Sequence, residues 1–271
     1  MMHEFRVEVI ISYPKKDKEM IRLTQLVNYL DDSMRPSDFS DYCPNGLQVE
    51  GMGNVIRLAT GVTASQALLD EAIDWGASAI LVHHGYFWNG DSKKVLGYRR
   101  RRLRTLLEND VSLLAYHLPL DAHPKFGNNA CFGRMIGIED YEPLYQDQPH
   151  AIGNVGDLVC DLKLGVLVDR IRTITDREPF LIGHSESVVR RVAWCTGAAQ
   201  SGIEAAIFAN ANVYISGEVS EQTFHVAKEE GIAYISAGHH ATERYGVQSL
   251  GEHLAGHFDI EHRFIDIVNP I

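Results

Sequence analysis

The sequence predicts an α/β protein made of two similar lobes that face each other across a cleft. Apolar, strand-like runs alternate along the chain with amphipathic stretches of about 10–15 residues, which favours βαβ units with parallel strand pairing. Two segments repeat the same order of expected elements. Polar residues of metal-ligand type follow several of the strands, where α/β sheets place their sites. We therefore expect an α/β fold with a site between its lobes.

Composition excludes several classes of protein. The 271 residues suffice for one large or two small domains with proper cores. The net charge of −11 disfavours binding to nucleic acid or to anionic membranes. The four cysteines are scattered and form no CxxC pair, as in a protein with reduced thiols. No apolar run spans a membrane, and the start is too charged for a signal peptide. We expect a cytoplasmic protein.

The first lobe is expected at residues 18–130, after an N-terminal extension at residues 1–17 that holds a short strand at 6–12. Residues 44–46 (PNG) predict a turn. Residues 117–124 read as a loop stiffened by two prolines. Helices are expected at residues 18–30, 65–75, 98–109 and 128–135, and strands at residues 55–62, 79–82 and 112–116.

The second lobe is expected at residues 131–271, with terminal elements free to exchange between the lobes. Residues 140–157 are polar and read as a connector or variable surface. Residues 158–174 mix strand and helix signals, with a helix beginning near Gly165. Strands are expected at residues 188–195, 212–216, 232–236 and 263–268, and helices at residues 202–209, 220–229 and 241–254.

The two lobes carry a possible internal duplication. Residues 55–85 and 189–219 each give a strand, a Thr-Gly pair, a helix, a second strand and a polar corner. A competing register pairs Gly61 with Gly217 instead, and a chance likeness of two α/β segments is a third interpretation. We prefer the first register because it preserves more of the element order. In either register, ligand-type residues lie at strand ends and would face a cleft between the lobes.

The central motif is Ala79-Ile-Leu-Val-His-His-Gly85, a buried strand that ends in two imidazoles. Neutral histidine is a favoured metal ligand. Neighbouring side chains diverge on a strand, so His83 and His84 should each bind a separate ion rather than chelate one. The alternative is a pair of hydrogen-bonded core histidines.

A second cluster strengthens the metal hypothesis. His239 and Glu243 are four residues apart and share a face if the helix has begun there. Asp121 supplies a further carboxylate. Three imidazoles and two carboxylates suit zinc, iron, manganese, cobalt or nickel, and the absence of thiolates argues against a closed structural zinc site. Two such ions about 3.5–4 Å apart would lower the pKa of bound water to roughly 7 and generate a hydroxide nucleophile.

Two further patterns each allow two interpretations. The aromatic loop Tyr86-Phe87-Trp88 lines a pocket or is part of the core. Five arginines fall within residues 99–104 and meet either an anionic substrate or solvent and partner charges. Consecutive helical residues point around the whole helix, so the five cannot share one site.

Several separated motifs resemble the Nif-three-like dinuclear metal-centre proteins, whose bacterial YbgI-type members are often labelled GTP cyclohydrolase I type 2 homologues. The resemblance extends from about Lys18 to the C-terminus. Its motifs are residues 41–51 (DYCPNGLQVEG), 81–85 (LVHHG), 116–129 (YHLPLDAHPKFGNN), 216–222 (SGEVSEQ) and 237–245 (AGHHATERY).

The resemblance implies two divalent metal ions at a domain interface and a ring-shaped homohexamer. Carried over by motif, His84 and Asp121 would hold one ion and His83 and His239 the other, with Glu243 as a bridge. Neighbouring or substrate-side roles would fall to His117, His123, His240 and Glu218. The chain is too short for the long inserted domain that some family members carry.

Two functions follow as hypotheses. The first is a metal-dependent hydrolase acting on a small molecule, with GTP or a related nucleotide as first substrate. GTP cyclohydrolysis adds water at C8 of the purine and releases formate, a reaction that metal-bound hydroxide suits. The second is a non-catalytic metal-handling or scaffold protein. No G-x-S-x-G elbow, Walker loop or G-x-G-x-x-G motif offers another chemistry.

Overall fold

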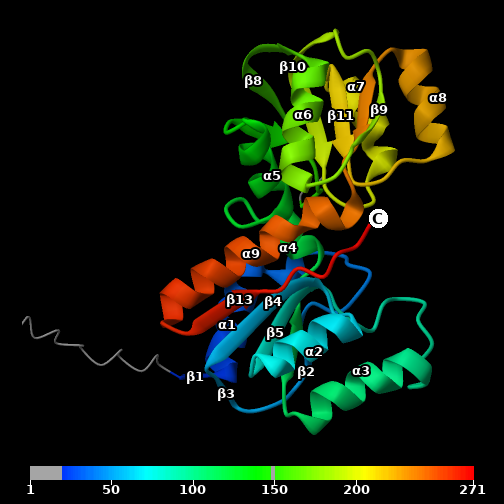
Figure 1. The fold of residues 1–271 in the computed structure, drawn as a ribbon. Coiled ribbons are helices and arrows are strands. Elements are labelled where there is room, and N and C mark those ends of the chain that lie inside the picture. Colours follow the sequence, from blue (N-terminus) through cyan, green and yellow to red (C-terminus); the bar gives the residue numbers. More distant parts are fainter. Residues whose placement is uncertain (1–19, 148–149) are drawn as a thin grey trace, which may run out of the picture.

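The computed structural model describes residues 20–147 and 150–271, and it has two lobes, each built on its own sheet (Figure 1). The predicted extension at residues 1–17, with its strand at 6–12, lies outside the described residues. Within the described part of the chain, no helix combines the length and the apolar character needed to cross a membrane.

The first lobe is organised around a five-stranded sheet. Three parallel neighbours occupy its centre, with a fourth parallel strand on one edge and an antiparallel strand on the other. The sheet order is β13 (Glu261–Phe264), β4 (Arg57–Thr63), β5 (Ala79–His84), β6 (Ser112–Ala115) and β2 (Gly46–Val49). A two-stranded ribbon of β1 (Ile21–Arg22) and β3 (Asn54–Val55) flanks it.

Helices cover both faces of this sheet because its strands are apolar on both sides. Leu81 packs on one face with α1 (Leu23–Met34) and α9 (His239–Phe258), while Ile80 packs on the other with α2 (Gln66–Asp74) and α3 (Gly97–Glu108). Alternate residues of a strand point to opposite faces, so one apolar run supplies both cores.

The second lobe repeats this three-layer arrangement. Its six-stranded sheet has the order β7 (Tyr141–Pro143), β8 (Asn154–Lys163), β10 (Val188–Cys195), β11 (Val213–Ser216), β12 (Ala233–Ser236) and β9 (Phe180–Ile182). The helices α5 (Asn128–Ile136) and α6 (Leu164–Thr175) cover one face, and α7 (Ile203–Phe208) and α8 (Glu221–Glu230) cover the other.

The succession of elements is the same in both lobes. The run β4-α2-β5-α3-β6 matches β10-α7-β11-α8-β12, and all four strand pairings within these runs are parallel. This is the element order on which the preferred register of the internal duplication rests.

The chain returns to the first lobe at its C-terminal end. Helix α9 leaves the junction of the lobes and runs along the first sheet, and β13 then pairs with β4 (Figure 1). The sequence range 131–271 therefore contributes to both sheets, an exchange of terminal elements for which the sequence interpretation allowed. Residues 141–236 supply all strands of the second sheet.

Two local expectations were wrong. The loop expected at residues 117–124 contains a short helix, α4 (Leu118–Ala122), with Pro119 in its first turn, where a missing N–H costs nothing. The connector expected at residues 140–157 contains β7 and the start of β8, an antiparallel pair whose partly exposed residues gave no apolar signal.

Candidate metal centre

Three elements bring the expected ligands together at the junction of the lobes. Strand β5 continues through both histidines, so His83 and His84 occupy its last two positions. Asp121 lies in α4, and α9 begins at His239, which puts Glu243 one turn further on the same face. Four of these side chains are at least four-fifths buried, and that of His239 is three-quarters buried.

The side chains form two groups that share Glu243. In the first group, His83 Nε2 lies 3.6 Å from Asp121 Oδ1 and 3.4 Å from Glu243 Oε1. In the second group, Glu243 Oε2 lies 3.2 Å from His84 Nε2 and 3.1 Å from His239 Nε2. Each group offers three donor atoms to one cation, with one oxygen of Glu243 facing each group.

This grouping differs from the pairing that the resemblance implied. The ligand atoms of His83 and Asp121 lie together, and those of His84 and His239 lie together, the reverse of the expected partners. The two adjacent imidazoles face different oxygens of Glu243, and both also lie in a further group of donors with His117.

Hydrogen bonds hold the imidazoles with Nε2 toward the centre. Nδ1 of His83 lies 3.1 Å from the Tyr116 carbonyl oxygen, which can only accept, so Nδ1 carries the hydrogen. Nδ1 of His239 lies 2.7 Å from the Glu218 carboxylate, and Nδ1 of His84 lies 3.0 Å from the Thr63 hydroxyl. Such partners fix the ring orientation of metal-ligating histidines.

Two buried atoms at the centre lack hydrogen-bond partners. His83 Nε2 and Glu243 Oε2 are both inaccessible to solvent and make no hydrogen bond. Unpartnered buried polar atoms are rare in folded proteins because losing hydration without compensation is costly. Cations between the two groups would satisfy both atoms, and nitrogen and oxygen donors suit the divalent metals expected from the sequence. The residues therefore fit a metal site.

The local electrostatics favour positive charge. Burial lowers the pKa of His83, but the charges of Asp121 and Glu243 outweigh it and raise that pKa to about 9. His239 follows the same pattern, with burial opposed by Glu243 and Glu218 and a pKa of about 9. Burial dominates at His84 and lowers its pKa to about 3. The two carboxylates thus attract cations to this buried position.

His117 lies beside this centre. It can approach both His83 and His84 with one ring nitrogen, and its Nδ1 is 2.7 Å from Asp41 Oδ1. Burial raises the pKa of Asp41, but hydrogen bonds from His117, Asn45 and the Leu118 backbone outweigh burial and lower it to about 2. The ionised Asp41 therefore orients His117 as Glu218 orients His239.

A family model described as Duf34/NIF3 (NGG1p interacting factor 3) matches residues 21–270. The chain belongs to the DUF34/NIF3 family. A Pseudomonas aeruginosa relative named GTP cyclohydrolase 1 type 2 homolog is 52% identical over 250 residues, 92% of this chain and 99% of the relative. An Escherichia coli K12 relative of the same name is 47% identical over 251 residues, 91% of this chain and 98% of the relative.

Solved structures agree with this membership. One described as protein ybgI, of unknown function, has a TM-score of 0.87 and 45% identity, and covers 93% of this chain and 100% of its own. A Thermus thermophilus protein has a TM-score of 0.82 and 32% identity with the same coverage. The resemblance to Nif-three-like proteins is thus confirmed.

Two of the candidate neighbours in this DUF34/NIF3 chain lie away from the ligand groups. His123 stacks on Phe126 and accepts hydrogen bonds from the backbone N–H groups of Lys125 and Phe126. It lines a cavity of about 350 Å³ between the lobes that also reaches Asp121. His240 points to the C-terminal segment, with Nε2 3.1 Å from Asp266.

Sequence reasoning did not single out several side chains that shape this DUF34/NIF3 site. The side-chain amide of Asn128 donates to Asp121 Oδ1 at 2.8 Å, and its side-chain oxygen Oδ1 accepts from the Gly246 N–H at 2.9 Å. Thr63 and Asp41 each hold one histidine. Asp41 and Asn128 fall within the motifs that carry the family resemblance, but no spacing rule links them to their distant partners.

Proposed function

We propose that this protein is a metal-dependent hydrolase that uses two divalent cations on a small-molecule substrate, with GTP or a related nucleotide as the first candidate. The observation that supports it is the pair of buried, unpartnered atoms, His83 Nε2 and Glu243 Oε2, among five donor residues. The choice of a nucleotide as substrate is supported by the names of the curated relatives, which refer to GTP cyclohydrolase. The metal is one of zinc, iron, manganese, cobalt or nickel.

In this proposal, His83 and Asp121 would hold one cation and His84 and His239 the other, and Glu243 would contribute one oxygen to each group. When bound, such cations acidify water and polarise the bond to be hydrolysed. The protein orients the imidazoles through Glu218, Thr63 and the Tyr116 carbonyl and keeps the ligands buried.

His117 is the side chain that we propose to move a proton. Its Nδ1 is bonded to the ionised Asp41, so Nε2 is the nitrogen left to give or take a proton beside His83 and His84. A carboxylate behind an imidazole stabilises the protonated ring, the arrangement general acid–base catalysis requires.

The proposed metal content is tested by elemental analysis of the purified protein beside Glu243→Gln. We expect about two divalent cations per chain in the wild type and loss of at least one in the variant, because one side chain serves both groups. Glu252→Gln is the matched control: it neutralises an exposed carboxylate on the same helix and should keep both cations. Equal metal content in the two variants would contradict the proposed bridge.

The proposed activity is tested by incubating metal-loaded protein with GTP and a panel of nucleotides and phosphoesters. Formate release from GTP, or phosphate release from another substrate, should appear in the wild type and fall at least a hundredfold in Glu243→Gln. Full metal occupancy without turnover of any substrate would instead favour a metal-handling or scaffold protein.

We also propose that the protein is a ring-shaped homohexamer in the cytoplasm. The hexamer is supported by the family resemblance. The compartment is supported by the cysteines, since Cys43, Cys131, Cys160 and Cys195 are all free thiols.

A further inference from the structure

A second cavity opens directly beside the candidate metal centre. It has a volume of about 240 Å³ and lies between the end of β5, the loop that follows it and helix α3. Its lining includes His84 together with Thr63, whose hydroxyl bonds to His84 Nδ1. A molecule in this cavity would therefore touch a ligand of the proposed second cation.

Aromatic rings form much of the wall. Tyr86 donates its hydroxyl hydrogen to the Ala64 carbonyl at 2.9 Å, and Trp88 donates its indole N–H to the Gly85 carbonyl at 3.1 Å. Because these polar atoms are already bonded to backbone, the two residues offer ring surface to the cavity. Phe87 and, from α3, the half-exposed Tyr98 add two further rings. The sequence interpretation that the aromatic loop lines a pocket agrees with this geometry.

The charge of the lining is opposite to that of the whole protein. Lys93, Lys94, Arg99 and Arg102 face a single carboxylate, Asp91, in a chain whose net charge is −11. Asp91 is already paired with Arg99 at 2.5 Å. Within the described residues, this leaves the two lysines and Arg102 without a carboxylate partner.

Arg102 is the most constrained of these cations. Its Nε is buried and makes no hydrogen bond. Its guanidinium lies 5.1 Å from the ring centre of Tyr98 and 6.0 Å from that of Tyr86, so the two rings hold it in place. Arg99 also lines this cavity but is paired with Asp91. The remaining arginines of the run do not line it: Arg100 and Arg101 are exposed, and Arg104 pairs with Glu108.

We propose that this cavity binds the substrate of the proposed hydrolase through a planar ring that carries a phosphate or carboxylate group. The ring would stack on Trp88 and Tyr86, and the anion would meet Arg102 with Lys93 and Lys94. The inference rests on the proposed hydrolase, since His84 joins the cavity to the metal centre. Arginine recognises both anions through paired N–H donors. The volume suits one ring system with its anionic group and is too small for a polymer.

Binding of small probes to the full-length, metal-loaded protein tests this proposal. Calorimetry would compare GMP with guanosine, and orotate with uracil, because each pair differs mainly in the anionic group. Ribose 5-phosphate tests the anion without a planar ring. We expect GMP or orotate to bind at least tenfold more tightly than its neutral counterpart and than ribose 5-phosphate. The pair that shows the difference distinguishes phosphate from carboxylate. Equal binding within both pairs would overturn the proposal.

Arg102→Gln provides the residue-level test. Because the variant loses a charged hydrogen-bond donor, the affinity for the anionic probe should fall about tenfold or more. Arg100→Gln removes an exposed arginine from the same helix and should change affinity less than twofold. Thermal unfolding checks that both variants are folded, and Arg102→Lys tests whether charge alone suffices. Equal affinities for the Gln variants would refute the assigned role of Arg102.

Failure of this proposal can be separated from failure of the proposed function. Arg102-dependent binding without turnover would support the cavity and refute the hydrolase. Metal-dependent turnover that is indifferent to Arg102→Gln in both KM and kcat would support the hydrolase and refute the cavity as its substrate site.

Discussion

At the scale of single residues, Gly197 shows how closely the protein backbone approaches the candidate metal centre. Its φ of +73° is a left-handed conformation that glycine adopts without cost. A Cβ at this position would lie 2.2 Å from Glu243 Oε1 and 3.6 Å from His239 Nε2. The space that a side chain would occupy is therefore taken by the proposed bridging carboxylate.

We predict that Gly197→Ala lowers metal content as well as stability. The added methyl must displace Glu243, and the positive φ costs alanine about 1 kcal/mol. Gly231→Ala is the control, because Gly231 has nearly the same φ of +70° and no atom within 4 Å of its Cβ position. In urea, its free energy of unfolding should fall only by the cost of the positive φ, and its metal content should not change. Equal metal content in the two variants would show that Gly197 does not constrain Glu243.

The ligand-type residues were predictable where they are neighbours in sequence. Adjacency in sequence indicates the pair His83 and His84, and the spacing of one helical turn indicates the pair His239 and Glu243. The partners that orient the histidines are distant in sequence. Thr63 of β4 bonds to His84 of the neighbouring strand β5, 21 positions later, and Asp41 bonds to His117, 76 positions later. Single-sequence patterns carry no information on such contacts. The pairing of the ligands, which was taken from the family resemblance, differs from the groups of donor atoms in the structure.

At the scale of elements, the packing of α5 against α9 sets the position of Asp121. Gly246 lets the two helices approach, and a Cβ there would lie 2.3 Å from Asn128 Oδ1. Asn128 in turn donates to Asp121. Helix packing is thereby linked to a proposed metal ligand through one amide side chain.

We predict that Gly246→Ala weakens metal binding although alanine is the better helix former. The methyl displaces Asn128, which leaves Asp121 Oδ1 without this donor. Gly256→Ala, in the same helix with open space around it, should instead raise the free energy of unfolding by about 0.5 kcal/mol. Metal titration followed by urea unfolding measures both effects. Tighter metal binding in Gly246→Ala would contradict the proposed link.

Most elements were predictable because apolar runs such as 79–82 and 188–195 have the length and bounding residues of buried strands. The exceptions have local causes. In α4, the proline that favoured a loop occupies the first helical turn. In β7 and β8, many positions are partly exposed, so the sequence lacks the alternation of apolar and polar residues that indicates a strand.

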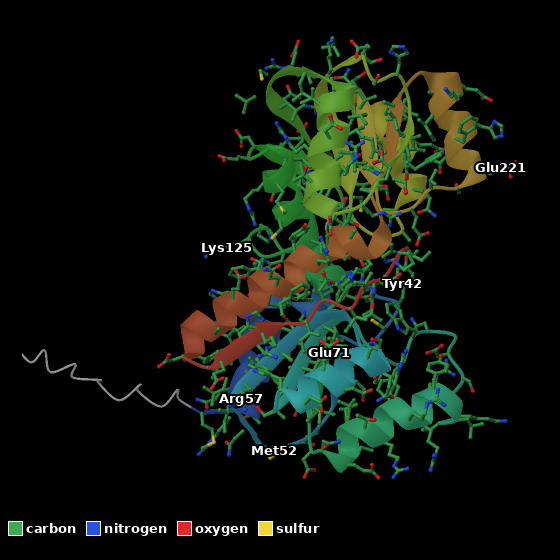
Figure 2. The ribbon with its side chains drawn as sticks, in the orientation of Figure 1. Tyr42, Met52, Arg57, Glu71, Lys125 and Glu221 are labelled. Atoms are coloured by element: carbon green, nitrogen blue, oxygen red, sulfur yellow. The ribbon has the colours of Figure 1, made fainter. Side chains whose placement is uncertain are left out.

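At the scale of the whole molecule, the lobes are joined by side chains as well as by the chain itself. Figure 2 shows side chains filling the junction around α4 and α9, with the labelled Tyr42 at its edge. The Gly246 N–H of α9 donates to the side-chain oxygen of Asn128 in α5, and the Gly197 N–H of the second lobe donates to the Thr242 hydroxyl of α9. The three-layer lobes were predictable from the alternation of strands and helices, and an exchange of terminal elements was allowed for. The pairing of β13 with β4 was not predictable, because strands so far apart in sequence leave no local signal of their pairing.

We predict a solution mass of six times the 30.3-kDa chain. Light scattering coupled to size-exclusion chromatography measures it, and comparison at two protein concentrations separates a stable ring from weak association. A monomer or dimer at micromolar concentration would refute the hexamer. The same measurement on Glu243→Gln would show whether assembly depends on the metal centre.

The path of the chain has a consequence for the order of biosynthesis. Two of the five donors, His239 and Glu243, lie among the last 33 residues, and the helix that carries them packs against a sheet completed only by the strand at 261–264. A nascent polypeptide therefore lacks the proposed bridging carboxylate until α9 has been synthesised. The proposed cations would therefore find all five donors only after this helix has been made, and a chain truncated before it would lack His239 and Glu243.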